Sequence, residues 1–264
     1  MKIHKFISVN AVLALMCLLP ACVTTTTGGF NVAASDEQAL QDYIQLATAY
    51  YDANDMTGAR RHVSSAMAID DSNSDIYTIL ALILQREGDL ELAEDNFQRA
   101  ISLNRDNSRA RNNYGVYLFG QDRFSEAYDQ LERVANDTNY VGRAFAFENL
   151  GRSALRLDRM DDAESAFMRA LQLDANLYVS ALELSQIRFD RQNWNSARQS
   201  YQQFLTILDF YNIAHTPRSL WIGIQIERIF QNSQLVNDFS LLLSTLYQDS
   251  PEYQLYRRSS NGNR

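Results

Sequence analysis

Residue types that commonly carry out catalysis or bind metals are few and scattered along this chain. His62 and His215 have no carboxylate or cysteine at the spacing of metal ligands. Residues 71–75 (DSNSD) imitate the start of a calcium loop, but Ile76 replaces its glycine and Leu82 its closing glutamate. No serine has the strand-turn-helix context of a hydrolase nucleophile. We therefore expect no catalytic residue, no metal ion and no enzymatic activity.

The chemistry that the sequence does predict is a covalent modification of Cys22. Lys2 and Lys5 precede the apolar residues 6–19, as in a secretory signal, and this segment is short for a membrane span. The signal ends in LPAC, which resembles the lipobox of bacterial lipoproteins, where the cysteine is lipidated and becomes the first residue. We expect a signal peptide at 1–21 and a lipid on Cys22. The alternative is an ordinary cleaved signal with an incidental cysteine.

The lipobox resemblance also predicts a location. Acyl chains would hold the protein firmly on a membrane, because each buried methylene contributes about 0.8 kcal/mol. Val23 rather than aspartate follows the cysteine, which in such lipoproteins implies the outer membrane, here its periplasmic face. Cys22 is the single cysteine left after cleavage, so no intrachain disulfide can form. Residues 22–39 then form the lipidated N-terminus and a flexible tether, and we expect no cofactor beyond the covalent lipid.

Small residues recur along the rest of the chain at nearly constant spacing. Alanine follows twelve residues later in five cases, and a bulky residue follows sixteen later in all six. The small residues are Ala47, Ala81, Gly115, Gly151, Ser185 and Gly223; the alanines are Ala59, Ala93, Ala127, Ala163 and Ala197; the bulky residues are Val63, Phe97, Leu131, Phe167, Tyr201 and Phe239. This period predicts stacked helix pairs, because one pair cannot bury its apolar face alone.

These repeats resemble tetratricopeptide (TPR) units, with small residues at the family's eighth and twentieth positions and a large one at its twenty-fourth. The resemblance implies an all-α fold, a right-handed superhelical solenoid of about six helix-turn-helix units spanning 40–248. A polar C-terminal tail covers 249–264. The units fall at about 40–73, 74–107, 108–141, 144–177, 178–211 and 216–248. The sixth departs furthest from the pattern, so it is either a binding unit or a cap.

The first helices of TPR arrays line a concave face, so the resemblance also implies a groove for protein partners. The family's groove positions correspond to Ile44, Thr48, Tyr51, Ile79, Leu82, Arg86, Asn112, Asn113, Val116, Phe119, Arg152, Leu155, Gln186, Phe189 and Trp221. These mixed apolar and amide groups suit an amphipathic helix or an extended peptide. For each residue the alternative is packing within the stack.

The charge balance excludes one class of partner. Of 24 lysines and arginines, both lysines lie in the signal segment, which leaves 22 arginines against 32 acidic residues and a net charge of −10. Binding to phosphate backbones needs a positive surface, so we expect no nucleic acid partner. An acidic surface favours partners that are basic or largely apolar. We expect the protein to be a monomer.

A lipobox followed by six TPR units resembles the type IV pilus pilotin family of outer-membrane lipoproteins. The resemblance spans nearly the whole chain, including the wider gaps before the fourth and sixth units. It implies a factor that binds the secretin subunit of the type IV pilus and promotes its outer-membrane localisation and multimerisation for pilus biogenesis. The alternatives are a TPR lipoprotein adaptor for outer-membrane protein insertion or for peptidoglycan hydrolase regulation.

Overall fold

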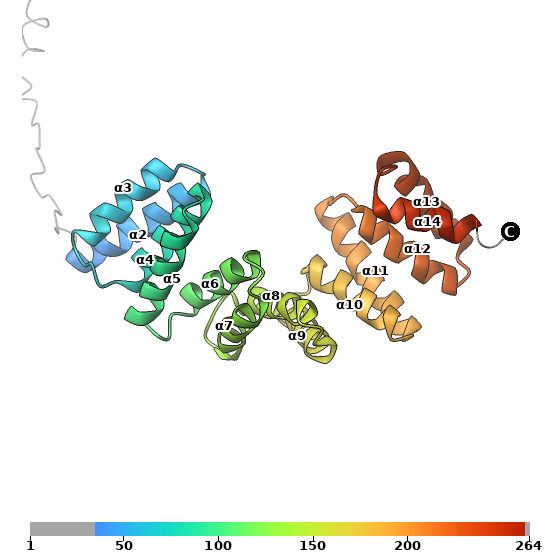
Figure 1. Cartoon of the computed structure of the whole chain (residues 1–264), viewed down its shortest axis with the longest axis horizontal. Coiled ribbons are helices and arrows are strands. Elements are labelled where there is room, and N and C mark those ends of the chain that lie inside the picture. The colour runs from blue at the N-terminus through green and yellow to red at the C-terminus, as the bar shows by residue number, and fades with distance from the viewer. Residues whose placement is uncertain (1–34, 262–264) are drawn as a thin grey trace, which may run out of the picture. The chain divides into compact units, whose positions relative to one another are not determined.

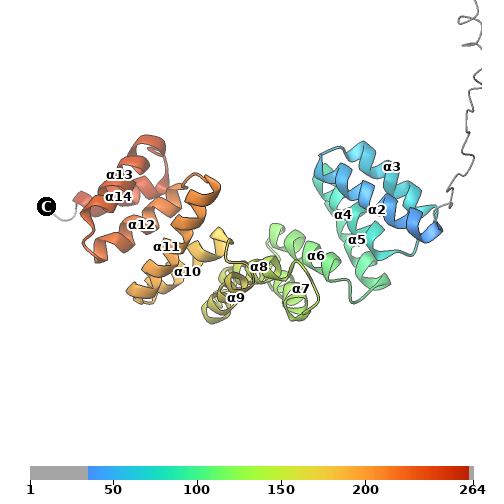
Figure 2. The ribbon, with the colours of Figure 1, turned by 180° about the vertical axis from the view of Figure 1, so that it is seen from behind.

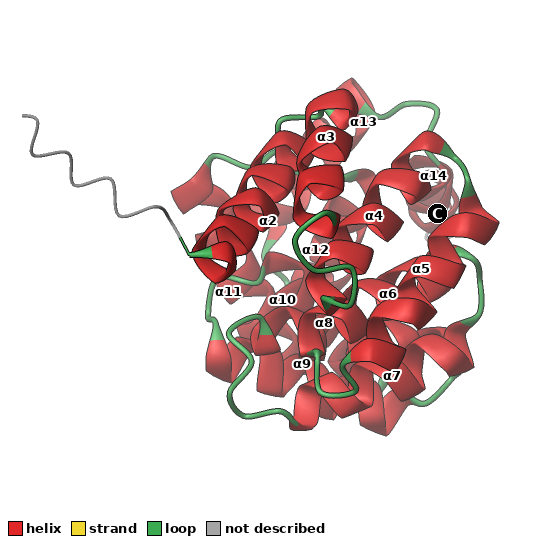
Figure 3. Cartoon of the chain, turned by 90° about the vertical axis from the view of Figure 1, so that its left-hand side faces the viewer, coloured by secondary structure: helices red, strands yellow, loops and turns green. Residues whose placement is uncertain are grey.

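The computed structural model describes residues 35–261, where thirteen helices and no strand are present (Figure 3). The signal segment 1–21, Cys22 and most of the tether lie outside the described residues. The helical core lies within the unit Leu40–Arg264. The prediction of an all-α fold is confirmed over the described range. None of the helices there combines the length and apolar character that a bilayer crossing needs.

Twelve of these helices form six helix-turn-helix pairs, whose members lie side by side in opposite views (Figures 1 and 2). The pairs are α2 (Asp36–Asp52) with α3 (Met56–Met67), α4 (Ser74–Glu87) with α5 (Leu90–Leu103), α6 (Ser108–Gly120) with α7 (Phe124–Asn136), α8 (Arg143–Arg156) with α9 (Met160–Leu173), α10 (Tyr178–Asp190) with α11 (Trp194–Tyr211), and α12 (Pro217–Ile229) with α13 (Ser233–Leu246). A single helix, α14 (Pro251–Asn261), follows.

The spacing of small and bulky residues positions the two helices of a pair. A Cβ built on Gly115 would lie 2.7 Å from Cγ of Leu131, and one built on Gly223 would lie 2.8 Å from Cε2 of Phe239. Leu131 and Phe239 are the bulky residues that stand sixteen positions after these glycines. The helices therefore touch where the repeat predicts, in the degenerate sixth unit as well as in the third.

One residue in the turn of every pair adopts a left-handed backbone conformation. The φ angles are 62° at Asn54, 91° at Gly88, 57° at Asp122, 60° at Asp158, 61° at Gln192 and 55° at Gln231. Glycine adopts this conformation without strain, whereas other residues crowd their Cβ against the backbone. The turn therefore requires a left-handed residue, and in five of the six pairs this residue is not glycine.

Successive pairs stack through shared apolar clusters. The largest cluster extends from α4 to α10 and includes Phe97 and Leu118, both fully buried. A second cluster joins α10 to α13 around Tyr201, and a third joins α2 to α4 around Ile79. Each cluster draws on more than one pair, so each pair depends on its neighbours for its core.

The segment 249–264, expected to be a polar tail, contains the helix α14. Pro251 occupies the start of this helix, and the backbone N–H of Tyr253 donates to Oγ of Ser250 at 3.2 Å. Tyr253 and Tyr256 pack against the apolar cluster of α10 to α13. Two tyrosines three residues apart share one helix face, which is why this otherwise polar sequence folds onto the last pair.

Candidate protein-binding groove

One groove brings together side chains from three successive first helices. It has a volume of about 410 Å³ and lies where α2, α4, α6 and the α7–α8 connector meet. Its lining residues are Thr48, Tyr51, Asp52, Ile79, Leu82, Arg109, Asn113 and Tyr140. Because α4 packs on α6, residues about four apart on each helix face the same space.

Polar groups in the groove are only partly engaged by the protein itself. The Thr48 hydroxyl donates to the carbonyl oxygen of Ile44 at 2.9 Å and accepts from Nη2 of Arg109 at 3.3 Å. No ion pair among the described residues involves Arg109. Burial raises the pKa of Tyr140, and the charge of Arg109 opposes that rise. The groove therefore offers a guanidinium and a neutral hydroxyl beside apolar walls.

A cation–π contact fixes one edge of the groove. The guanidinium carbon of Arg86 lies 3.9 Å from the centroid of the Tyr51 ring, and Nη1 of Arg86 donates to the Tyr51 carbonyl oxygen at 2.8 Å. This pair joins the first helices of the first two units, α2 and α4. The contact orders the Tyr51 ring before a partner binds, so binding does not have to pay the entropy of ordering it.

The groove contains five of the residues that the sequence predicts for it: Thr48, Tyr51, Ile79, Leu82 and Asn113. Ile44 does not line the groove, and Ile79 lines it with little exposed surface, because both are core residues, 5% and 1% exposed. The two isoleucines pack between α2, α3 and α4.

Apart from Asn113, the predicted residues of the third and fourth units do not line the groove. The guanidinium carbon of Arg152 is 4.8 Å from the Phe119 ring centroid, so these two side chains contact each other. Phe119 and Leu155 pack against the central apolar cluster, and Val116 is 41% exposed. Oδ1 of Asn112 is buried and has no hydrogen-bond partner within the protein.

The predicted residues of the last two units are likewise separate from the groove. Nε2 of Gln186 donates to Oδ1 of Asp190 at 2.8 Å. Phe189 meets Trp194 edge to face with ring centroids 5.1 Å apart. Trp221 packs against the cluster of α10 to α13. These side chains stabilise the C-terminal pairs.

Three groove residues were absent from the sequence-based set: Asp52, Arg109 and Tyr140. Arg109 is the second residue of the third unit, and the second residue is one of the family's groove positions, so the repeat could have predicted it. Tyr140 comes from the connector between the third and fourth units, and the wider repeat spacing there is its only signal. Asp52, the last residue of α2, is the thirteenth residue of the first unit, which is also one of the family's groove positions, so the repeat could have predicted it too.

The groove is suited to binding a polypeptide. Ile79 and Leu82 provide an apolar wall, while Asn113, Arg109 and Thr48 can hydrogen-bond to a peptide backbone or side chain. Within residues 35–261 no group of three or more histidine, cysteine, aspartate or glutamate side chains could hold a metal ion.

Comparison with known proteins defines the class. Tetratricopeptide repeat models match residues 78–141 and 146–177, and the chain is a TPR protein whose all-α solenoid fold agrees with the prediction. The type IV pilus assembly protein PilF of Pseudomonas aeruginosa is 31% identical over 242 residues, which cover 90% of this chain and 93% of PilF. The chain therefore belongs to the PilF family.

Solved structures agree with this assignment. A Pseudomonas aeruginosa PilF structure superposes with a TM-score of 0.80 at 31% identity, covering 85% of this chain and 99% of that one. PilW, titled a widely conserved type IV pilus biogenesis factor, gives a TM-score of 0.68 at 21% identity, covering 83% and 98%. The PilW match supports the fold alone.

Proposed function

We propose that this protein is an outer-membrane pilotin of the type IV pilus, anchored by a lipid on Cys22. Its groove binds the secretin subunit and promotes the localisation and multimerisation of that subunit. The observation that carries the proposal is the 31% sequence identity to PilF, a type IV pilus assembly protein, over 90% of the chain. A role in pilus biogenesis follows from the family. Secretin binding, the lipid anchor and the outer-membrane location are the further steps that we propose.

The groove supports the binding step. In this proposal the protein covers apolar surfaces of the secretin subunit reversibly, until multimerisation buries them. Leu82 provides apolar contact, and Asn113 can hold the backbone of a bound segment. The protein acts by binding, and we propose no enzymatic step.

The decisive experiment is an immunoblot of unboiled outer-membrane fractions for secretin multimers, in the host with and without this gene. We expect the multimers to vanish while the monomer persists, and the wild-type gene to restore them. Unaffected multimers would contradict the pilotin role and favour adaptor functions in outer-membrane protein insertion or hydrolase regulation.

The lipid anchor is tested separately. Cys22→Ala should leave the protein soluble or in the inner membrane, with loss of secretin multimers but not of secretin binding by the purified protein. Unchanged outer-membrane fractionation of Cys22→Ala would exclude the anchor while leaving the groove hypothesis intact.

A further inference from the structure

A second pocket, outside the groove, is rich in arginine. It has a volume of about 640 Å³ and lies where the α5–α6 connector, α6, the end of α7 and the α7–α8 connector meet. We call it the arginine pocket. Its lining residues are Arg105, Asp106, Ser108, Arg111, Arg133, Asp137 and Asn139. None of these lines the groove, because α6 presents Ser108 and Arg111 on a face roughly opposite to Arg109 and Asn113.

The three arginines of this pocket form no ion pair within residues 35–261. Ten ion pairs among the described residues involve eight arginines, and none involves Arg105, Arg111 or Arg133. Arg111 donates from Nε to the carbonyl oxygen of Arg105 and from Nη1 to Oε1 of Gln130, both at 2.9 Å. Its hydrogen-bond acceptors are thus neutral, and its positive charge is available to a ligand.

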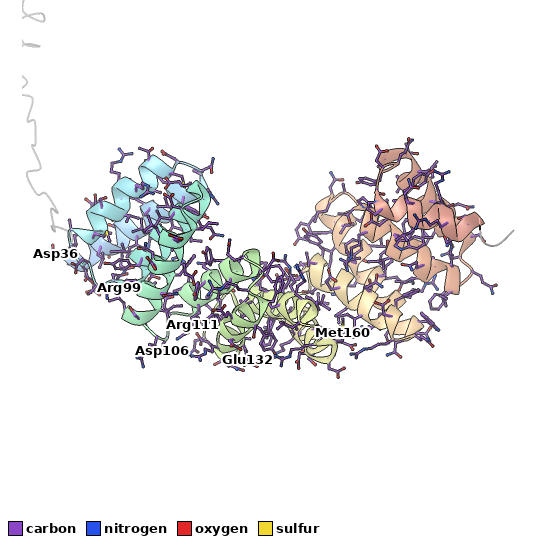
Figure 4. All side chains as sticks on the ribbon, viewed as in Figure 1. Asp36, Arg99, Asp106, Arg111, Glu132 and Met160 are labelled. Carbon is purple, nitrogen blue, oxygen red and sulfur yellow. The ribbon has the colours of Figure 1, made fainter. Side chains whose placement is uncertain are left out.

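Gathering these charges is unfavourable for the protein alone. Burial lowers the pKa of Arg111, and the charges of Arg133 and Arg105 lower it further, while Asp106 partly compensates. Figure 4 shows Arg111 on α6 and Asp106 in the connector before it. Arg133 lies in the last turn of α7, where the helix dipole favours a cation, but this does not account for the other two arginines.

We propose that the arginine pocket binds a carboxylate-bearing segment of a partner protein. Three guanidinium groups that line one pocket and form no ion pair there are complementary to an acidic ligand, even in a chain with an excess of acidic residues. Guanidinium groups pair well with carboxylates in bidentate geometry. This surface goes beyond the groove and does not depend on the identity of the protein bound there.

Two aspartates in the pocket distinguish a carboxylate segment from a polyphosphate. Asp137 accepts from Oγ of Ser108 at 2.5 Å and from the backbone N–H of Asn139 at 3.0 Å. The Ser108 hydrogen bond is the main reason that the pKa of Asp137 is lowered, so this carboxylate stays ionised. Together with Asp106 it would repel a polyphosphate more strongly than a peptide with one carboxylate per residue, because the polyphosphate carries more charge in the same space.

The test uses the purified folded protein and a fluorescein-labelled hexaglutamate peptide, with fluorescence anisotropy at low salt. We expect measurable binding that hexaglutamine does not show and that added salt weakens. The variant Arg105→Gln/Arg133→Gln changes two exposed side chains and should weaken binding about fivefold or more. The matched control Arg61→Gln/Arg169→Gln removes the same charge from exposed positions outside the pocket and should bind as the wild type does.

Three results would overturn the proposal. One is no hexaglutamate binding by the wild type, and another is equal weakening in both double variants, which would mean a general charge effect. The third is tighter binding of pyrophosphate or of phosphatidylglycerol vesicles than of hexaglutamate, lost in Arg105→Gln/Arg133→Gln. That result would assign the pocket to phosphate groups instead of carboxylates.

Discussion

Gly151 of α8 lies directly against the aromatic ring of Phe167 of α9, and a Cβ on Gly151 would come within 2.8 Å of Cε1 of that ring. Phe167 is fully buried, so its ring has no room to withdraw. Gly151→Ala should therefore cost about 1–3 kcal/mol in the free energy of unfolding through overpacking, reduced by up to about 1 kcal/mol through better helix propensity. Denaturant unfolding followed by circular dichroism measures the loss.

Gly120 provides the matched control for this substitution. It is the last residue of α6, and no heavy atom lies within 4 Å of a Cβ built on it. Gly120→Ala should leave stability unchanged or raise it by up to about 1 kcal/mol. Equal effects of the two substitutions would show that close helix contact does not require glycine at position 151.

Gly88 tests backbone conformation separately from packing. A Cβ there would meet no atom within 4 Å, but φ is 91°, in the left-handed region. Gly88→Ala should cost about 1 kcal/mol because an L side chain is strained in this conformation. The measurement is the same unfolding experiment, with Gly120→Ala as control. A stability equal to wild type would mean that the turn relaxes to a negative φ.

The repeat made the fold predictable from sequence because its spacing encodes a physical contact. A small residue and a bulky one sixteen positions apart must meet when two helices pair, and Gly115 with Leu131 shows that they do. α14 was not predicted as a helix, because its apolar signal consists of Tyr253 and Tyr256 within a polar sequence and lies outside the repeat.

The groove was predictable only where it follows the repeat. Thr48, Leu82 and Asn113 occupy repeated positions, and all three line this pocket. Tyr140 lies in a connector, whose path depends on its own turns and not on the repeat. Ile44 is buried at 5% exposure, because position in a repeat does not tell whether a side chain faces the groove or the adjacent helix.

A buried ion pair should control the stability of the fifth and sixth units. Glu227 is 2% exposed and accepts from Nε and Nη2 of Arg198 at 3.0 and 2.8 Å. Arg198→Gln should cost about 3–5 kcal/mol, because it leaves the buried carboxylate of Glu227 without its partner charge. As control, Asp162→Ala breaks the pair with Arg159, whose side chains are both 46% exposed, and should cost at most about 1 kcal/mol. Similar losses in urea unfolding would contradict the expected role of burial.

His215 should make stability depend on pH. Burial lowers its pKa below 6.5, and its ring packs beside Phe204 and Phe239 with centroids 6.1 and 5.7 Å away. The folded protein then binds a proton less readily than the unfolded chain, so this contribution is complete above about pH 6.5 and is lost as the pH falls. His215→Gln should flatten the decrease in melting temperature between about pH 7 and pH 5. An unchanged pH profile in the variant would exclude His215 as its cause.

The compact groove and the longer sequence-based set of residues predict different mutational effects on secretin binding. Arg109→Gln/Asn113→Ala removes two polar contacts inside the groove from half-buried positions, and should weaken binding of the purified secretin subunit about tenfold, as expected for partly desolvated contacts. Arg152→Gln changes a residue that packs on Phe119 instead and should bind normally. Surface plasmon resonance with both variants and the exposed control Arg169→Gln separates the cases. Weak binding by Arg152→Gln together with normal binding by the groove variant would place the secretin segment on the third and fourth units.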